Sequence, residues 1–405
     1  YKPFKAYVDP ALDLSSDIFA NIRKQDYLVQ HPYDSFDAVL NFIKKAAHDD
    51  KVLAIKMTLY RVSGNSPIIK YLGEAAQAGK QVTVLVEVKA RFDEQNNVHW
   101  AITLEQMGCH VIYGLKGLKT HTKITLVIRR DEDGIRRYLH LGTGNYNDVT
   151  AHFYTDMGLF TCQRELGIDA TNLFNMLSGY SRPPYFRQLR ISPEHIREFI
   201  NQKIDREIEI AKAGRHAEIH MKMNSLSDPE IIAKLYEASH AGVIIHLIVR
   251  GICCLRTDLP GISDNIEVHS IVGRLLEHSR IYYFYNDGND EIFLSSADMM
   301  KRNLNRRVET LFPILQPDLK ARAIAIYDKM WQDNVKARVL HDQSYSMIDL
   351  RGKEAVNSQE YFINEAVEKN RVLKEKRKEM ARKPEAFKVM RKEDNGLTLG
   401  DQKDA

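Results

Sequence analysis

The sequence predicts an α/β fold of two tandem domains, each a mostly parallel mixed sheet flanked by helices. Three observations lead to this class. Apolar, β-branched runs alternate with amphipathic helix patterns, the alternation recurs in the second half, and helix-breaking residues separate the halves. A length of 405 residues, with 44% hydrophobic and 28% charged residues, accommodates about two globular domains.

The first half alternates helices and strands as crossover units do. Ser35 is the expected N-cap of the first helix, Pro67 lies in the first turn of the second, and Gly79 ends it. Helices are expected over 35–50 and 66–80, strands over 52–61 and 81–94, and a helix–strand pair over 97–114.

An internal duplication defines the domain organisation. The stretch "AEIHMKMNSLSDPEIIAKLYEASHAGVIIHLIVRGIC", residues 217–253, matches residues 53–91 element by element. Prolines break a helix between the two copies, at Arg182-Pro183-Pro184. We therefore expect one domain over 1–188, a second over 189–350 and a charged tail over 351–405, which is helical at first and then disordered.

The stretch "LKTHTKITLVIRR", residues 118–130, is expected to form one continuous strand. Side chains of a strand alternate between its faces, so His121 and Lys123 share one face, while Ile124 and Leu126 anchor the other in a core. In the second repeat His278-x-Arg280 takes the matching position. Small polar turns follow both pairs, at 142–145 and 295–298.

This pattern resembles the phospholipase D superfamily, which pairs two such repeats around one active site and uses a histidine as its nucleophile on phosphorus. The superfamily motif is HxKx4D, and the first repeat has Ile128 in the place of the aspartate. The second repeat has Arg280 in the place of the lysine. The resemblance therefore implies two phospholipase D-like domains, and it disfavours the alternative function of a phosphodiesterase.

A closer resemblance is to the bacterial polyphosphate kinase family. It rests on the motifs "MTLYRVSGNSPII", "KARFDE", "HTK", "HLGTGNYN", "YTDMGLFT", "VRGICCL", "LEHSR" and "LSSADMM", which occur in order through residues 30–345. The resemblance implies reversible transfer of the γ-phosphoryl group of ATP to inorganic polyphosphate through a phosphohistidine. The family's N-terminal and helical head domains are not visible, and the chain begins without Met, so we expect that it lacks upstream sequence.

The resemblance assigns the reacting groups. It implies that His121 is the phosphorylated nucleophile, with Lys123 beside it and His278 as acid/base and nucleotide contact. His140 is the rival nucleophile and, with Asn145 and Arg280, is expected to support the site from outside. A neutral imidazole suits this chemistry, because its ordinary pKa near 6.5 leaves it nucleophilic at cellular pH.

Further residues are implied to hold the substrates. Tyr154, Arg250 and His278 correspond to ATP contacts, and Arg61 and Arg91 to the Mg²⁺ site. A guanidinium has no lone pair for a metal, so we expect the two arginines to bind the phosphates that carry Mg²⁺. Lys301 and Arg302 are candidates for a polyphosphate channel, although a solvated helix start explains them equally well.

Composition limits the partners. The net charge is only +4, so a polyanion must be held by a local cluster of cations. "GLKGLKT" is not a Walker A loop, because Leu118 precedes its lysine, and no His/Cys cluster has zinc spacing.

The expected partners are ATP/ADP and polyphosphate, with no nucleic acid. The family resemblance also implies homo-oligomerisation and peripheral membrane association. Sparse cysteines indicate the cytoplasm. A non-catalytic polyphosphate-binding module is the other alternative.

Overall fold

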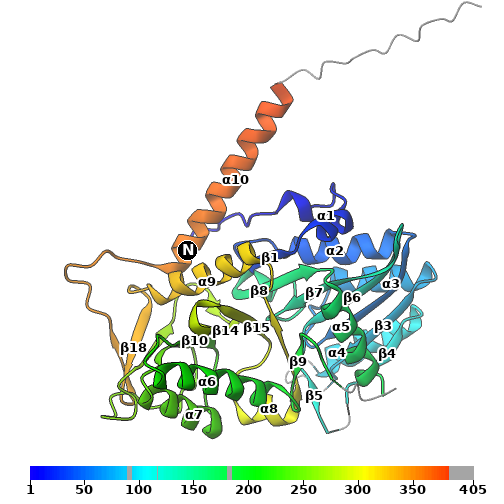
Figure 1. Ribbon diagram of the computed structural model, residues 1–405. Coiled ribbons are helices and arrows are strands. Elements are labelled where there is room, and N and C mark those ends of the chain that lie inside the picture. Colours follow the sequence, from blue (N-terminus) through cyan, green and yellow to red (C-terminus); the bar gives the residue numbers. More distant parts are fainter. Residues whose placement is uncertain (89–93, 116, 180–184, 383–405) are drawn as a thin grey trace, which may run out of the picture.

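The computed structural model describes residues 1–88, 94–115, 117–179 and 185–382, and it contains two mixed sheets that correspond to the two repeats (Figure 1). The first sheet has the strand order β1-β8-β7-β6-β2-β3-β4. Its strands are β1 (Tyr27–His31), β2 (Val52–Leu59), β3 (Gln81–Val86), β4 (His110–Ile112), β6 (Ile124–Asp131), β7 (Gly134–Gly142) and β8 (Tyr154–Thr161).

The second sheet has the order β19-β18-β12-β11-β10-β14-β15-β17-β9. Its strands are β9 (Arg190–Ile191), β10 (Glu218–Met223), β11 (Ile244–Val249), β12 (Ile266–Ile271), β14 (Arg280–Phe284), β15 (Glu291–Ser295), β17 (Thr310–Pro313), β18 (Ala337–His341) and β19 (Ser344–Met347).

Both sheets are mixed and flanked by helices, as predicted, but the expectation that they are mostly parallel is wrong. Parallel pairing joins β2–β3–β4 in the first sheet and β10–β11–β12 in the second. Along the two strand orders given above, the other pairings are antiparallel. The reason is the length of the connections: a crossover helix permits parallel pairing, whereas β6 and β7 follow each other through a tight turn.

Helices cover the outer faces of both sheets and fill the space between them (Figure 1). The helices are α1 (Ile18–Lys24), α2 (Asp37–His48), α3 (Pro67–Gln77), α4 (Glu94–Gln106), α5 (Arg164–Leu177), α6 (Ile196–Lys212), α7 (Pro229–His240), α8 (Lys301–Arg306), α9 (Pro317–Trp331) and α10 (Ser358–Arg382). Short 3₁₀ turns occur at Pro10–Leu12, Thr150–His152 and Asn286–Gly288.

The two repeats share a hydrophobic core. Leu126 and Leu139 of the first sheet belong to the same buried cluster as Ile281 and Phe312 of the second. Since full burial of a large apolar side chain contributes about 1.5–3 kcal/mol, this cluster holds the repeats in one body. Separate cores lie under α2 and α3 in the first repeat and under α6 and α7 in the second.

Two short strands pair with strands of the opposite repeat. β5 (Lys119–Thr120) pairs in parallel with β16 (Arg307–Val308) of the second repeat, and β13 (Leu276–Glu277) pairs in parallel with β8 of the first. The predicted continuous strand over 118–130 is therefore wrong. It breaks between β5 and β6 because the backbone N–H of His121 donates to the carbonyl of Val308, at 2.8 Å, in the opposite repeat.

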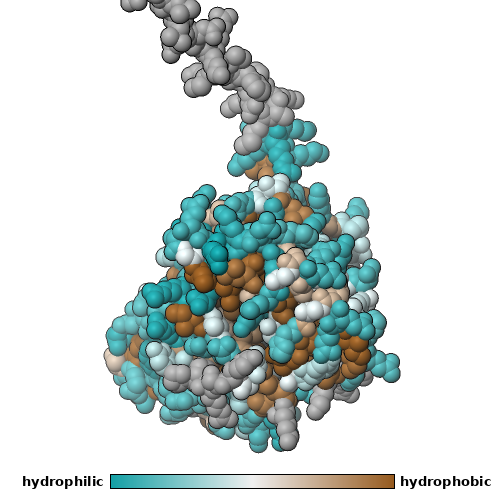
Figure 2. Space-filling view, turned by 90° about the vertical axis from the view of Figure 1, so that its right-hand side faces the viewer, coloured by the Kyte–Doolittle hydropathy of each residue, from teal (hydrophilic) through white to brown (hydrophobic). Residues whose placement is uncertain are grey.

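The start of the charged tail packs against the body. Phe362 and Ile363, in the first turns of α10, are buried, and Phe362 lies 5.2 Å from the ring of Tyr33. We expected a solvated helix, and for its first turns this is wrong, because these apolar residues complete the shared core. Farther along, α10 leaves the body with a mostly hydrophilic surface (Figure 2). In the described part of the chain, no helix combines the length and apolar character of a membrane span.

Candidate active site

His121 lies in the break between β5 and β6, at the boundary of the two repeats. Its Nδ1 lies 2.8 Å from Oε2 of Glu309, a residue of the second repeat, so the carboxylate accepts the Nδ1 proton. This hydrogen bond leaves Nε2 as the nitrogen with an available lone pair. The ring is buried, and its edge meets the face of Tyr60, with 4.7 Å between ring centroids and an interplanar angle of 87°.

Glu309 is held in place by its own hydrogen bonds. The hydroxyl of Ser296 donates to Oε2 at 2.5 Å, and the side-chain amide of Asn303 donates to Oε1 at 2.6 Å. Glu309 is fully buried, and this burial raises the pKa of the carboxyl, although the charge of Lys123 opposes the rise. The arrangement fixes both the tautomer and the direction of the His121 ring.

His278, in the second repeat, is hydrogen-bonded in the same way to a carboxylate of the first repeat. Its Nδ1 lies 2.8 Å from Oδ2 of Asp156 in the first repeat, and the Thr143 hydroxyl donates to Oδ1 of Asp156 at 2.7 Å. Burial raises the pKa of Asp156, but the charge and hydrogen bond of His278 outweigh it and hold that pKa below its ordinary value. Each histidine is thus oriented by a carboxylate from the other repeat.

Gly144 leaves the space that the Asp156 carboxylate occupies. A Cβ placed on Gly144 would lie only 2.1 Å from Oδ2 of Asp156, so a larger residue at 144 would displace the carboxylate that holds His278. Glycine at this position therefore allows the turn after β7 to approach the acid closely.

Buried cations surround the two histidines. Lys123 and Arg280 are both buried, and Arg307 lies on β16 next to Glu309. Burial lowers the pKa of His121 well below its ordinary value, and the charges of Lys123, Arg307, Arg280 and His278 lower it further. These interactions bring the predicted residues His121, Lys123, His278 and Arg280 into one electrostatic site.

Lys123 and Arg280 are themselves anchored. Lys123 Nζ donates to the backbone carbonyl of His121, and burial lowers the pKa of its ammonium well below the ordinary value. Arg280 forms two hydrogen bonds to Asp298, at 3.1 and 3.2 Å, and its Nη1 also donates to the Thr143 carbonyl at 3.3 Å. Arg280 therefore spans from the second repeat into the first.

Tyr60 contacts His121 and two cations of the first repeat. Its ring forms a T-shaped contact with His121, the Lys123 ammonium lies 5.4 Å from its centroid, and the Arg61 guanidinium lies 5.9 Å from its centroid. A cation over an aromatic face is stabilised by about 0.5–2 kcal/mol. Arg61 and His121 thus contact the same ring, whereas Arg91 lies outside the described residues.

The expected nucleotide contacts gather beside His278. The Tyr154 ring lies 5.1 Å from the His278 ring, at the start of β8. The Arg250 guanidinium is half-buried and donates twice to Oδ1 of Asn224, at 3.0 and 2.7 Å. Burial lowers the pKa of Arg250, and the nearby charge of Arg280 contributes in the same direction. Arg250 also interacts electrostatically with Tyr154, so Tyr154, Arg250, His278 and Arg280 are near one another.

His140 lies in a different environment from His121. Its Nδ1 is 2.8 Å from the Tyr146 hydroxyl, its ring lies 4.7 Å from Phe160, and burial lowers its pKa to about 3. Its Nε2 has no hydrogen-bond partner among the described residues. Asn145 borders a small cavity with His140, and its Oδ1 also lacks a partner there. In the part of the chain that the structure describes, no hydrogen bond joins either residue to His121.

Lys301 and Arg302 open α8, and both side chains are exposed. Asn303, the next residue, binds Glu309. The two cations are therefore exposed on the short helix whose Asn303 holds Glu309, the carboxylate that binds His121.

Among the described residues, the carboxylates of the site are already engaged. Asp156 and Glu309 bind the histidines, and Asp298 binds Arg280. Among the described residues, the metal-compatible group of His, Cys, Asp or Glu side chains lies elsewhere, on β10 and β11. The cationic site fits the phosphates that carry Mg²⁺ better than the ion itself.

Sequence reasoning missed Asp156, Glu309, Arg307 and Tyr60. A signal for the two carboxylates was available, because "YTD" at 154–156 and "RVE" at 307–309 occupy matching places in the duplication. Their role depends on contacts between repeats, which the alignment of the two halves does not reveal.

Two family models match the chain. The model described as Polyphosphate kinase C-terminal domain 1 matches residues 17–183, and Polyphosphate kinase C-terminal domain 2 matches residues 189–359. A solved polyphosphate kinase from Porphyromonas gingivalis has a TM-score of 0.84 and 38% identity, covering 94% of this chain and 57% of that chain. Phosphatidylserine synthase from Haemophilus influenzae has a TM-score of 0.52 and 12% identity, covering 88% of this chain and 95% of that chain. At this identity the similarity shows the fold alone. The expected tandem phospholipase D-like fold is confirmed.

Curated relatives agree with these matches. Polyphosphate kinase of Lactiplantibacillus plantarum is 68% identical over 367 residues, which is 90% of this chain and 51% of the relative. Polyphosphate kinase of Bacillus anthracis is 55% identical over 346 residues, which is 85% of this chain and 49% of the relative. The chain spans about half the length of the curated relatives it matches. It belongs to the polyphosphate kinase family, of which it carries C-terminal domains 1 and 2.

Proposed function

We propose that the chain transfers the γ-phosphoryl group of ATP to inorganic polyphosphate, reversibly, with His121 as the phosphorylated nucleophile. The main observation in support is the hydrogen bond from His121 Nδ1 to Glu309, close to the charges of Lys123, Arg280 and Arg307. The names of the relatives support the same activity.

In the first step, the lone pair on Nε2 of His121 attacks the γ-phosphorus. The bond from that phosphorus to the β–γ bridging oxygen breaks, and ADP leaves with the electron pair. Glu309 keeps the Nδ1 proton in place and stabilises the ring as it gains positive charge. In the second step, a terminal oxygen of polyphosphate attacks the phosphorus on Nε2 and restores the free imidazole.

Cations provide most of the catalysis in this proposal. Phosphoryl transfer passes through a loose transition state whose charge lies on the equatorial oxygens, so fixed positive groups stabilise it directly. Lys123 and Arg280 are the buried candidates, and His278, oriented by Asp156, acts as acid or base on the opposite side. Tyr154 and Arg250 hold the nucleotide, and Arg61 holds its phosphates.

Mg²⁺ belongs to the proposal through the substrate. When bound to the phosphates it neutralises part of their charge, while the residues described here bind those phosphates. Arg61 and Arg91 are assigned to this task.

The cellular setting is proposed from the sparse cysteines and the family resemblance. We expect a cytoplasmic homo-oligomer that does not bind nucleic acid and that associates peripherally with the membrane. The domain limits at 1–188 and 189–350, predicted from the internal duplication, stay predictions.

Trapping of the phosphohistidine tests the proposal. The chain is mixed with ATP labelled at the γ-phosphate, and label that is acid-labile and base-stable is expected on the peptide that contains His121. His121→Gln should abolish this label, and addition of polyphosphate should remove it from the wild type. Label on His140, or turnover without a labelled histidine, would overturn the assignment.

The two alternatives have separate tests. Release of product from a phosphodiester of lipid or nucleic acid, lost in His121→Gln, would favour the phosphodiesterase. Polyphosphate binding that is equal in wild type and His121→Gln, together with no phosphoryl transfer by the wild type, would favour the binding module.

A further inference from the structure

We propose that a first-row transition metal ion, Zn²⁺ foremost, binds to Glu218, His220 and His246 on the second sheet. The three residues lie outside the phosphohistidine site and have no role in the proposed function. The inference therefore does not depend on the function being correct.

The backbone brings the three side chains together. Glu218 and His220 are two residues apart on β10, so they share one face of the strand, and His220 pairs with His246 on the parallel neighbour β11. Glu218 Oε1 lies 2.7 Å from His220 Nε2 and 3.8 Å from His246 Nδ1. One ligand atom from each residue lies within 4.8 Å of the others. The His220 and His246 rings stack on each other at 5.0 Å and 23°, so one ring must turn before both can bind the same tetrahedral ion.

Two aromatic residues of α9 fix the imidazole planes. Tyr327 stacks on His220 at 5.0 Å and 13°, and Trp331 stacks on His246 at 4.3 Å and 18°. The Tyr327 hydroxyl also donates to the backbone carbonyl of His246 at 2.8 Å. These contacts hold both rings beside Glu218, and the turn of one ring is part of the cost of binding an ion.

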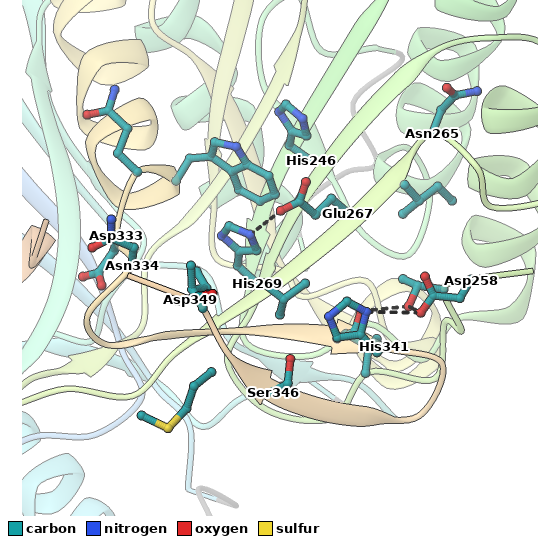
Figure 3. A pocket seen from close by; sticks show the side chains of 18 of the residues that line it. His246, Asp258, Asn265, Glu267, His269, Asp333, Asn334, His341, Ser346 and Asp349 are labelled. Carbon is teal, nitrogen blue, oxygen red and sulfur yellow. Dashed lines mark hydrogen bonds and ion pairs between the residues drawn. The ribbon is translucent and has the colours of Figure 1, made fainter. Parts of the chain in front are cut away.

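An entry path exists on the side of His246. His246 lines a cavity of about 880 Å³ that is bordered by β12, the β18–β19 hairpin and the end of α9. Figure 3 shows His246 in this cavity beside Glu267 and His269, whose side chains are joined by a hydrogen bond of 2.6 Å. A hydrated ion can therefore reach one ligand from solvent.

The donor set determines the class of ion. Two imidazole nitrogens and one carboxylate oxygen with an open fourth position form a set that Zn²⁺ uses in proteins, whereas Mg²⁺ and Ca²⁺ prefer oxygen ligands.

The fold itself does not require this group. The matching positions of the first sheet hold Ala54 and Lys56 on β2 and Thr83 on β3, and these three residues form no such donor set. The chelating residues are therefore a property of the second repeat alone within this duplicated pair.

Fluorescence of Trp331 reports the location of the ion. The chain has two tryptophans, so Trp100→Phe leaves Trp331, which stacks on the ligand His246, as the only emitter. The protein is stripped with a chelator and titrated with Co²⁺ in excess Mg²⁺. We expect saturable quenching at one ion per chain, reversed by Zn²⁺, whose filled d shell does not quench.

Ligand variants make this test decisive, with circular dichroism to verify folding. Removal of a partner that only supports a ligand costs about 10–100-fold in metal affinity, so Glu218→Gln and His246→Asn should each weaken Co²⁺ binding by at least about tenfold. His240→Asn, at an exposed histidine of α7, should bind as the parent does. Absence of quenching in the parent, or equal affinity in the parent and both folded ligand variants, would overturn the proposal.

Discussion

His121 and Glu309 are 188 residues apart in the sequence, yet Nδ1 of the histidine lies 2.8 Å from Oε2 of the glutamate. His278 and Asp156 repeat this relationship in the opposite direction, with 2.8 Å between Nδ1 and Oδ2. The two histidines are therefore oriented across the boundary between repeats, and the consequences can be measured.

Glu309→Gln should lower the rate of His121 phosphorylation by about a hundredfold or more. The amide keeps the size of the side chain, but it lacks the charge that fixes the Nδ1 proton and stabilises the ring during attack. Single-turnover labelling from γ-labelled ATP measures this rate. Glu198→Gln, at an exposed acid on α6, is the control, and an unchanged rate in Glu309→Gln would contradict the proposed orientation.

Lys123→Met should shift the acid limb of the pH–rate profile to higher pH. Burial is the main cause of the lowered pKa of His121, and the Lys123 charge is the next. Without this charge the pKa rises, so the nucleophile is protonated earlier as pH falls. Profiles of kcat/KM between pH 5 and 8 measure the shift, with Lys212→Met, an exposed residue, as the control. An acid limb at the same pH would contradict the interaction.

Tyr60→Leu should weaken binding of ATP by about 2–30-fold, whereas Tyr60→Phe should differ little from the wild type. The aromatic face stabilises the Lys123 and Arg61 cations by about 0.5–2 kcal/mol, and the hydroxyl is not needed for this interaction. Equilibrium binding of a non-hydrolysable ATP analogue measures the effect. Equal losses in the two variants would assign the effect to the hydroxyl instead.

Lys222→Met should destabilise the fold by about 3–5 kcal/mol. Lys222 and Glu277 form a fully buried ion pair at 3.1 Å, and removal of the lysine leaves a buried, uncompensated carboxylate. Urea unfolding followed by circular dichroism measures the loss. The double variant Lys222→Met/Glu277→Gln should recover part of this stability; a double variant that is less stable than the single variant would contradict the argument.

His140→Phe should flatten the pH dependence of stability below pH 6.5. The folded pKa of His140 is about 3, and an unfolded histidine titrates near 6.5, so the unfolded chain binds the extra proton first as pH falls. The neutral ring's contribution is complete above pH 6.5 and decreases by about 1.4 kcal/mol per pH unit below it. Unfolding at pH 7.5 and 5.0 measures the slope. His240→Asn is the control, and identical slopes in wild type and His140→Phe would contradict this reading.

Most of the fold follows from local patterns. Pro67 lies at the first position of α3 and Gly79 follows the helix with φ of +85°, because helix start and stop signals depend on nearby residues. The break at His121 does not follow from such patterns. The residues around it favour a strand, and the competing hydrogen bond comes from Val308 of the other repeat.

The site was predictable only in part for the same reason. The duplication and the family motifs place His121, Lys123, His278 and Arg280 together, and the structure does so. The carboxylates Asp156 and Glu309 are not adjacent in sequence to the histidines they orient, so their roles depend on the packing of the two repeats. Arg91 was predicted as a phosphate ligand and stays a prediction.

The exchange of carboxylates between repeats has a consequence for phosphoryl transfer. Any opening of the boundary separates His121 from Glu309 and His278 from Asp156 in the same motion. Both histidines thus lose their carboxylate partners together. Under the proposed function, a molecule with a separated boundary would be inactive in both roles at once.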